Sequence, residues 1–175
     1  MARPRGQTHK MTTRGESREA RLADCRRQVI ERGLEVGSRA CAVRTFTKED
    51  INAFARITGD LNPYHFDAAF AAASRFGRPI AHGLLVAAVL TEIGGQWAWL
   101  ATWMTFRFIA PVHAGDTITL EVAVVSLTEK NFAEAEASWT NQDGKVVLSG
   151  TLGGYPPTGH QRELLASQAA AHAPE

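Results

Sequence analysis

Alternation of apolar and polar side chains dominates the second half of the chain. Every second position is apolar over residues 117–124 and 133–140, which predicts two strands with one buried face each. Asp143-Gly144 favours a tight turn into the strand that follows, so the last two strands should form a hairpin. The expected strands cover residues 102–112, 117–124, 133–140 and 145–152.

A helical period governs the first half, after a short strand expected over residues 38–46. Thr47 can cap the N-terminus of a helix, and Gly59 is a natural residue to end it. Between them the side chains of one helix face recur with helical spacing, at Ile51, Phe54, Ala55 and Thr58. Asn62 and Pro63 predict the start of a second helix, which an alanine-rich run continues.

Residues 84–93 form an almost wholly apolar segment. A helix of this kind is too uniform to lie on a surface, so we expect it to be buried, with Gly94 and Gly95 ending it. The preceding residues, 75–83, contain glycine and proline and should form a loop. One buried helix with an antiparallel sheet around it is an α+β layout, and the open edges of such a sheet favour pairing with a second copy.

Length and composition agree with one domain of ordinary size. The chain has 175 residues and a mass of 19.0 kDa, with 45% hydrophobic and 21% charged residues, so it can bury a core without a disulfide or a metal. Its longest aliphatic stretch, residues 84–90, is far too short to span a bilayer. We divide the chain into a basic extension (1–33), a core domain (34–156) and a C-terminal tail (157–175).

Charge is distributed unevenly along the chain. Residues 1–33 hold nine Lys and Arg against four Asp and Glu, whereas the remainder holds ten against fourteen. A basic arm can bind nucleic acid or an anionic surface, and an Arg-rich start can also be a transit peptide. We interpret the arm as a solvated leader, with neither nucleic acid nor membrane as a partner. Residues 21–33 are expected to form a short helix, which packs against a partner subunit in the alternative interpretation.

Cys25 and Cys41 are the two cysteines of the chain, and they form no CxxC pair. Without a secretory context, such cysteines are typical of reduced thiols in a cytoplasmic protein. We therefore expect a cytoplasmic location.

A carboxylate and an imidazole flank the Asn62-Pro63 turn. Asp60 follows the end of the first helix and His65 lies in the first turn of the next, so both side chains can reach one point. Such a pair can hold one water molecule, remove its proton and return a proton. Each residue alone is equally compatible with a loop acid or a half-exposed histidine, but together they are the best candidates for a catalytic pair.

Gly83 joins the loop of residues 75–83 to the apolar helix. Free backbone N–H groups at a helix start suit a carbonyl oxygen that gains negative charge, and a glycine lets a ligand approach the backbone closely. A plain turn glycine is the alternative interpretation of this residue.

Two stretches, TGDLNPYH (58–65) and SRFGRPIAHGL (74–84), resemble the MaoC-like dehydratase family, and in particular its (R)-specific enoyl-CoA hydratases. The resemblance extends from about residue 34 to residue 154. It implies a hot-dog fold, in which a sheet wraps a long central helix, and a homodimer. It also implies reversible hydration of trans-2-enoyl-CoA, or dehydration of 3-hydroxyacyl thioesters, with a coenzyme A or acyl-carrier thioester as substrate and no cofactor.

By this resemblance Asp60 and His65 are the catalytic pair that holds the water, and the backbone N–H of Gly83 binds the thioester carbonyl oxygen. Supporting or substrate-contacting roles fall to Asn62, Tyr64, Thr91 and His82. Thr91 stands where a hydratase has serine, and Tyr64 replaces a common aliphatic residue, which leaves the length of the acyl chain open.

Three alternatives remain at this point. His65, Asp67 and His82 could be offered as metal ligands, but their spacing matches no recognised metal motif, and we expect no metal. A hot-dog acyl-CoA thioesterase would use the same fold for hydrolysis. A non-catalytic protein that binds acyl thioesters would need no acid–base pair, so the presence of Asp60 and His65 argues against it.

Overall fold

The computed structural model describes residues 17–171, so the expectation of a solvated arm over residues 1–16 lies outside this part. The strands in it are β1 (Arg39–Thr45), β2 (Leu100–Phe108), β3 (Thr117–Leu127), β4 (Ala133–Asn141) and β5 (Val146–Tyr155). The helices in it are α1 (Arg18–Arg32), α2 (Lys48–Thr58), α3 (Pro63–Phe66), α4 (Ala68–Ala72), α5 (Gly83–Ala87), α6 (Leu90–Trp97) and α7 (Gly159–Ala171).

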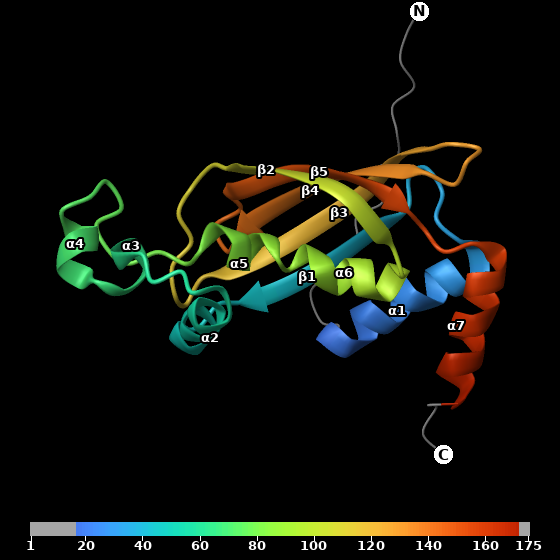
Figure 1. Cartoon of the computed structure of the whole chain (residues 1–175), viewed down its shortest axis with the longest axis horizontal. Helices are drawn as coiled ribbons and strands as arrows, with labels where there is room; N and C mark the ends of the chain where they lie inside the picture. Colours follow the sequence, from blue (N-terminus) through green and yellow to red (C-terminus); the bar gives the residue numbers. More distant parts are fainter. Residues whose placement is uncertain (1–16, 172–175) are drawn as a thin grey trace, which may run out of the picture.

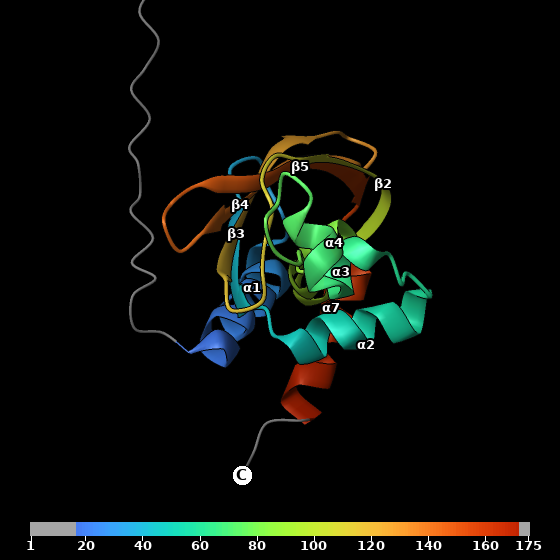
Figure 2. The ribbon, with the colours of Figure 1, turned by 90° about the vertical axis from the view of Figure 1, so that its left-hand side faces the viewer.

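The strands form one antiparallel sheet in the order β1-β3-β4-β5-β2. Figure 1 shows this sheet curved over α5 and α6, with α2, α3 and α4 at one end of the molecule and α1 and α7 at the other. Figure 2 looks at the molecule from the end that carries α3 and α4 and shows the same curved cross-section. The α+β architecture expected from the sequence is therefore confirmed.

Alternation along the strands decides which face of the sheet is inside. In β4 every second side chain is buried from Ala133 to Trp139, whereas Glu134 and Glu136 between them are exposed. The buried side chains join those of α5 and α6 in a single hydrophobic core. Burial of this apolar face, at roughly 25 cal/mol per Å², is what holds the sheet on the helices.

The ends of α2 follow the sequence signals closely. The Thr47 hydroxyl accepts a hydrogen bond from the backbone N–H of Asp50, whose carboxylate in turn accepts from the backbone N–H of Thr47. Gly59 ends the helix with φ of 75°, in the left-handed region that glycine adopts without strain. This end of α2 fixes where the chain turns toward the next helix.

The prediction of a single long helix over residues 84–93 is wrong, because the chain forms α5 and α6 with a break at Ala88 and Val89. Around the break the backbone hydrogen bonds span three residues, for example from Thr91 N–H to the Ala88 carbonyl at 3.0 Å. Nor do the paired glycines end the helix. Burial of Trp97 carries α6 past them, and it stops where Ala98 adopts φ of 49°.

Two further boundaries differ from expectation. The helix that begins at Pro63 is split into α3 and α4, because the Asp67 carboxylate accepts from the backbone N–H groups of Ala69 and Phe70 and so starts a new helix. The strand expected over residues 102–112 covers Leu100–Phe108 instead. It ends there because the next two backbone N–H groups, of residues 109 and 110, both donate to one carbonyl, that of residue 147.

Helix α1 covers the free edge of β1. Residues 21–33 were expected to be helical, and the helix indeed ends at Arg32 but already begins at Arg18. It packs against α6, β1 and α7 of its own chain through the buried Val29 and Cys25. The backbone N–H of Cys41 in β1 hydrogen-bonds to the Cys25 thiol, and burial raises the pKa of both thiols. Both cysteines are free and buried, so the β1 edge is closed by packing.

The opposite edge of the sheet, β2, is bare in the described part of the chain. Its side chains include exposed Leu100 (69%), Met104 (42%) and Phe108 (55%). An uncovered strand edge with large apolar side chains is a surface that favours association. Between residues 17 and 171, no helix combines the length and the apolar composition that crossing a membrane requires.

Candidate active site

Two connections bring three titratable side chains together at one end of the sheet. Asp60 comes from the turn after α2, His65 from α3, and His82 from the last residue before α5. One carboxylate oxygen of Asp60, Oδ2, lies 3.8 Å from Nε2 of His65 and 3.9 Å from Nε2 of His82. The structure thus brings Asp60 and His65 together as the sequence predicted, with His82 as a third member.

The side chain of Asp60 is held by its own turn. Its Oδ1 accepts a hydrogen bond from the backbone N–H of Asn62 at 3.2 Å, and its backbone N–H donates to the hydroxyl of Thr58 at 3.3 Å. These two bonds leave Oδ2 facing the imidazoles. A separation of 3.8 Å is too long for a direct hydrogen bond to His65 and suits one water molecule in contact with both groups.

His65 is fixed as a neutral acceptor toward Asp60. Its Nδ1–H donates to the carbonyl oxygen of Ile80 at 2.8 Å, so the lone pair is on Nε2, the nitrogen that faces Asp60. Burial lowers the pKa of His65, and so does the nearby His82, against the opposite effects of the Ile80 carbonyl and Asp60. A base that stays unprotonated in neutral solution is what proton removal from water requires.

A cavity of about 640 Å³ opens beside these groups. We call it the acid–base cavity; its walls are Phe54, Thr58, Asp60, Arg75, Phe76, Ile80, Ala81, His82, Gly83, Leu84, Val86, Phe108, Ile109, Ala110, Pro111, Val112, Val147 and Leu148. Most of this wall is apolar, and its polar side chains are Thr58, Asp60, Arg75 and His82. His65 does not line this cavity but a second hollow of about 430 Å³, together with Lys48, Arg78 and His113.

Gly83 is the first residue of α5 and lines the acid–base cavity. A Cβ atom on this residue would lie 2.6 Å from Cε1 of Phe108. A side chain at this position would therefore have to displace the Phe108 ring. The backbone N–H of Gly83, at the start of a helix, has no carbonyl four residues before it within α5. The sequence predicted Gly83 but not Phe108, because nothing local to either residue connects them.

The other predicted residues have different positions. Asn62 caps α3 through a hydrogen bond from the backbone N–H of Tyr64. The ring of Tyr64 packs edge-on against Phe70 and Phe76 and does not line the acid–base cavity. The exposed Thr91 donates its hydroxyl hydrogen to the Ala88 carbonyl and lines a separate cavity.

That separate cavity, of about 440 Å³, lies at the other end of β2. We call it the tryptophan cavity; its walls are Leu90, Thr91, Ile93, Gly94, Gly95, Trp97, Ala98, Trp99, Leu100, Ala101, Met104, Val122 and Leu152. None of these side chains is titratable. Such a space accepts an apolar group and offers no acid or base.

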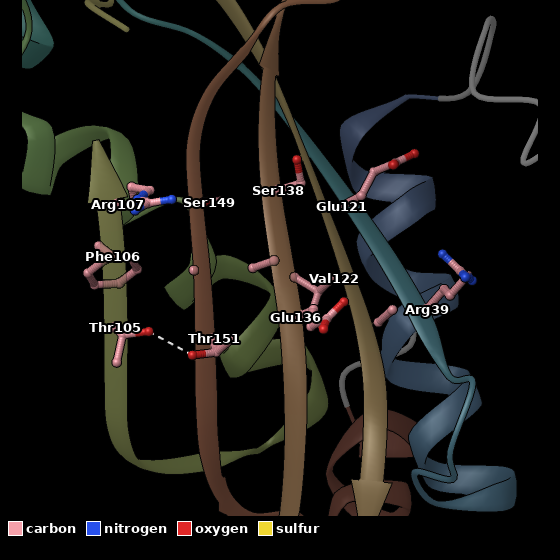
Figure 3. A pocket seen from close by; sticks show the side chains of 13 residues that line it. Arg39, Thr105, Phe106, Arg107, Glu121, Val122, Glu136, Ser138, Ser149 and Thr151 are labelled. Carbon is pink, nitrogen blue, oxygen red and sulfur yellow. Dashed lines mark hydrogen bonds between the residues drawn. The ribbon is translucent and has the colours of Figure 1, made fainter. Parts of the chain in front are cut away.

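A third hollow, of about 600 Å³, lies on the solvent face of the sheet (Figure 3). Its exposed side chains include Arg39, Arg107 and Glu136, and the hydroxyls of Thr105 and Thr151 hydrogen-bond to each other at 2.6 Å. Charges of both signs and mutually paired hydroxyls are typical of a solvated sheet face. We assign no chemistry to it.

The Asp60, His65 and His82 cluster has the residue types of a metal site, with one possible ligand atom from each residue within 4.8 Å of the others. Its geometry fits acid–base chemistry better. His82 Nε2–H donates to the backbone carbonyl of Asp60 at 3.0 Å, so that nitrogen has no lone pair for a metal. Asp67, offered by the sequence as a third ligand, is occupied in capping α4.

The amino-acid sequence is similar to proteins of known activity. Residues 35–143 match the family model described as a MaoC like domain. The chain is 36% identical over 124 residues to an (R)-specific enoyl-CoA hydratase of Aeromonas caviae, covering 67% of this chain and 91% of that protein. It is 38% identical over 122 residues to a 3-hydroxybutyryl-CoA dehydratase of Methylorubrum extorquens, covering 67% and 77%.

Among solved structures, the (R)-hydratase of A. caviae involved in PHA biosynthesis superposes with a TM-score of 0.68 at 34% identity, covering 72% of this chain and 99% of that one. This similarity confirms the hot-dog fold. The helices α1 and α7 lie outside the residues that the family model matches.

Proposed function

The chain belongs to the family of MaoC-like domains, and from this premise we propose that it is a hydratase of trans-2-enoyl thioesters. It adds water reversibly across the double bond to give a 3-hydroxyacyl thioester, of R configuration as in the names of its relatives. The observation that carries the proposal is the 3.8 Å gap between Asp60 Oδ2 and His65 Nε2, beside a largely apolar cavity that Asp60 lines. No other described cavity combines an apolar wall with such a pair.

In the proposed reaction one water molecule contacts Asp60 Oδ2 and His65 Nε2. The water oxygen bonds to C3 of the enoyl group while an O–H bond of the water breaks, and the proton goes to this pair. A proton from the pair then bonds to C2, so no group is left charged at the end. His65 is prepared for proton transfer because its Nδ1–H is already bound to the Ile80 carbonyl.

Negative charge develops on the thioester oxygen as water adds. The backbone N–H of Gly83 is the donor we assign to this oxygen. The Phe108 ring lies against Gly83 in the same wall of the acid–base cavity. The apolar wall of the acid–base cavity accommodates the first carbons of the acyl chain.

The reaction involves only proton transfer and addition of water, so we propose that it needs no cofactor and no metal. Dialysis against a chelator is expected to leave turnover unchanged. Loss of turnover that a divalent cation restores would contradict this.

We also propose a homodimer that forms through the bare β2 edges. Two antiparallel copies of a strand of residues 100–108 pair about its midpoint, Met104, and then the first residues of one strand lie beside the last residues of the other. The partner's tryptophan cavity would thereby come next to Phe108 and the acid–base cavity. The distal part of an acyl chain could then lie in apolar surroundings from both subunits.

The Met104→Lys variant tests this arrangement, because a charge in the centre of an edge strand opposes pairing. We expect light scattering to give the mass of one chain for this variant and of two for the wild type. Val125→Lys is the matched control, since Val125 is exposed to a similar degree but lies on β3. An unchanged dimer in Met104→Lys would place the interface elsewhere.

The two buried free thiols suit a reducing compartment, and we propose a cytoplasmic location. Fractionation with detection by a tag tests this.

One assay separates the proposed reaction from its alternatives. With crotonyl-CoA, a hydratase removes the absorbance of the conjugated double bond and releases no free thiol. A hot-dog thioesterase releases free coenzyme A, and a non-catalytic binding protein binds the thioester without either change. We expect the first outcome, with the R enantiomer by chiral chromatography; either of the other two would overturn the proposal.

A further inference from the structure

We propose that His82 is a positioning residue, which holds Asp60 and His65 at the separation that one water molecule requires. The proposal rests on the function proposed above. It assigns His82 no contact with the reacting atoms, only control over the two groups that make such contacts. Three observations support it, from the hydrogen bonds, the ring packing and the burial of this residue.

The first observation is the hydrogen bond that the side chain of His82 makes. His82 precedes α5, where a polar side chain often caps a helix, yet it makes no capping hydrogen bond. Its Nε2–H instead donates to the backbone carbonyl of Asp60 at 3.0 Å. The imidazole thus anchors the turn that presents the Asp60 carboxylate, although the two residues belong to different connections.

The second observation is ring packing. The ring of His82 stacks on that of His65, with centroids 3.7 Å apart and planes inclined by 30°. The rings of Phe54 and Phe66 also pack against the ring of His82, with centroids 5.1 and 5.8 Å from its centroid. The plane of His65 is consequently set on one side by His82 and at Nδ1 by the Ile80 carbonyl. Because the ring is held at these two points, Nε2 of His65 faces Asp60.

The third observation is an unpaired nitrogen. His82 is 2% exposed, and its Nδ1 is buried with no hydrogen-bond partner among the described residues. A buried polar atom without a partner is unfavourable, so an aromatic or aliphatic residue would fill this space more favourably if packing were the only requirement. The Nε2–H bond to Asp60 is what an apolar residue could not provide.

His82 also contributes to the electrostatic surroundings of His65. After burial itself, His82 is the neighbour that lowers the pKa of His65, while the Ile80 carbonyl and Asp60 raise it. Lys48 of α2, Arg78 of the loop before α5 and His113 of the loop after β2 line the same hollow as His65. Removing His82 changes one of these influences and leaves the others in place.

Two variants separate the hydrogen bond from the ring. His82→Gln keeps a donor N–H at about the position of Nε2 and removes the ring, whereas His82→Phe keeps a ring for stacking and removes the donor. His160→Gln is the control, because His160 is exposed on α7 and contacts Glu163. Thermal unfolding of each variant establishes that it is folded; if His82→Phe is not, His82→Leu takes its place as the variant without a donor.

Turnover of crotonyl-CoA is the first measurement. We expect His82→Phe to lower kcat about 10- to 100-fold with little change in KM, since misplacement of a catalytic group by about 1 Å has effects of this order. His82→Gln should recover most of that loss. Equal and severe loss in both variants would overturn the role of the hydrogen bond, and kcat of folded His82→Phe within about twofold of the wild type would overturn the proposal as a whole.

The second measurement does not depend on turnover. Titration of the His65 imidazole by NMR should move to higher pH in both variants and stay in place in His160→Gln. A wild type that hydrates no enoyl thioester would contradict the proposed function, while the titration of His65 would still test its coupling to His82. An unmoved His65 titration together with normal kcat would refute the positioning role even if the wild type is an active hydratase.

Discussion

The acid–base cavity and the tryptophan cavity lie at opposite ends of the same strand, β2, the first beside α5 and the second beside α6. The first has Asp60 and His82 in its wall, with His65 behind them, whereas the second has no titratable side chain. The sheet and helices therefore supply two similar apolar spaces. What makes one of them reactive comes from the segment between α2 and α5, which carries Asp60, His65 and His82.

The difference teaches that the scaffold and the chemistry are separable in this fold. Residues of the connections should change the rate or pH dependence of the reaction, and residues of the tryptophan cavity should change mainly stability. The predictions below test this division, in order of decreasing expected effect.

The largest effect is expected from the catalytic pair. Asp60→Asn and His65→Ala should each lower kcat by about 10²- to 10⁴-fold, the usual contribution of a positioned acid–base group. Steady-state hydration of crotonyl-CoA measures this. Asp143→Asn and His160→Ala, at an exposed turn and on α7, are controls that should retain full turnover. Near-normal turnover in either folded site variant would remove that residue from the mechanism.

Substitutions in the tryptophan cavity should change the free energy of unfolding. Trp97 is fully buried and stacks on Trp99 with centroids 6.0 Å apart, so Trp97→Ala should lower the free energy of unfolding by about 3–5 kcal/mol. Denaturant unfolding measures the loss. Trp103→Ala should lose less, because Trp103 is 39% exposed on β2. A loss for Trp97→Ala below that of Trp103→Ala would contradict the assignment of this cavity to the core.

The pH dependence of kcat/KM should follow the protonation of His65. Its pKa lies below the usual value of 6.5, chiefly through burial, so the neutral imidazole persists as the pH falls through that value. We expect kcat/KM to stay above half of its maximum at pH 6.5 and to reach half-maximum only in more acidic solution. The unfolded chain takes up this proton first, so the stability that His65 contributes should also decrease as the pH falls below its usual pKa. A half-maximal rate at or above pH 6.5 would contradict the pKa direction.

The smallest effect is expected at Gly95, in the interior of α6. A Cβ on this residue would meet no heavy atom within 4 Å, so Gly95→Ala should stabilise the helix by about 0.5–1 kcal/mol. Calorimetry should give a rise in Tm of a few degrees, with unchanged turnover of crotonyl-CoA. A lower Tm would mean that the wall of the tryptophan cavity does not tolerate even one methyl group.

The parts of the structure that sequence alone could predict depend on short-range interactions. Thr47 caps α2 by bonding to a residue three positions away, and Gly59 ends it through its own φ. The approach of Asp60 to His65 follows from the turn that Asn62 and Pro63 form between them. Each of these signals is complete within a few residues, and each was confirmed.

The parts that sequence could not predict depend on packing between distant segments. A wholly apolar segment has the same sequence pattern whether it forms one helix or two. The break between α5 and α6 therefore could not be predicted from the pattern of residues 84–93. Glycine propensity predicted a helix end at Gly94, but burial of Trp97 outweighed it. The bond from His82 to the Asp60 carbonyl joins two loops whose relative position only the folded sheet determines.

The cover that α1 provides over β1 limits how far this protein can polymerise. A sheet with two open edges can add copies at both sides without end, which produces fibres. Here one edge is sealed by Val29 and Cys25 of α1. In the dimer proposed above, pairing through β2 uses the remaining edge of each copy, so growth would stop after two subunits. Helix α1, which lies outside the residues matched by the family model, would thereby act as a terminator of strand addition.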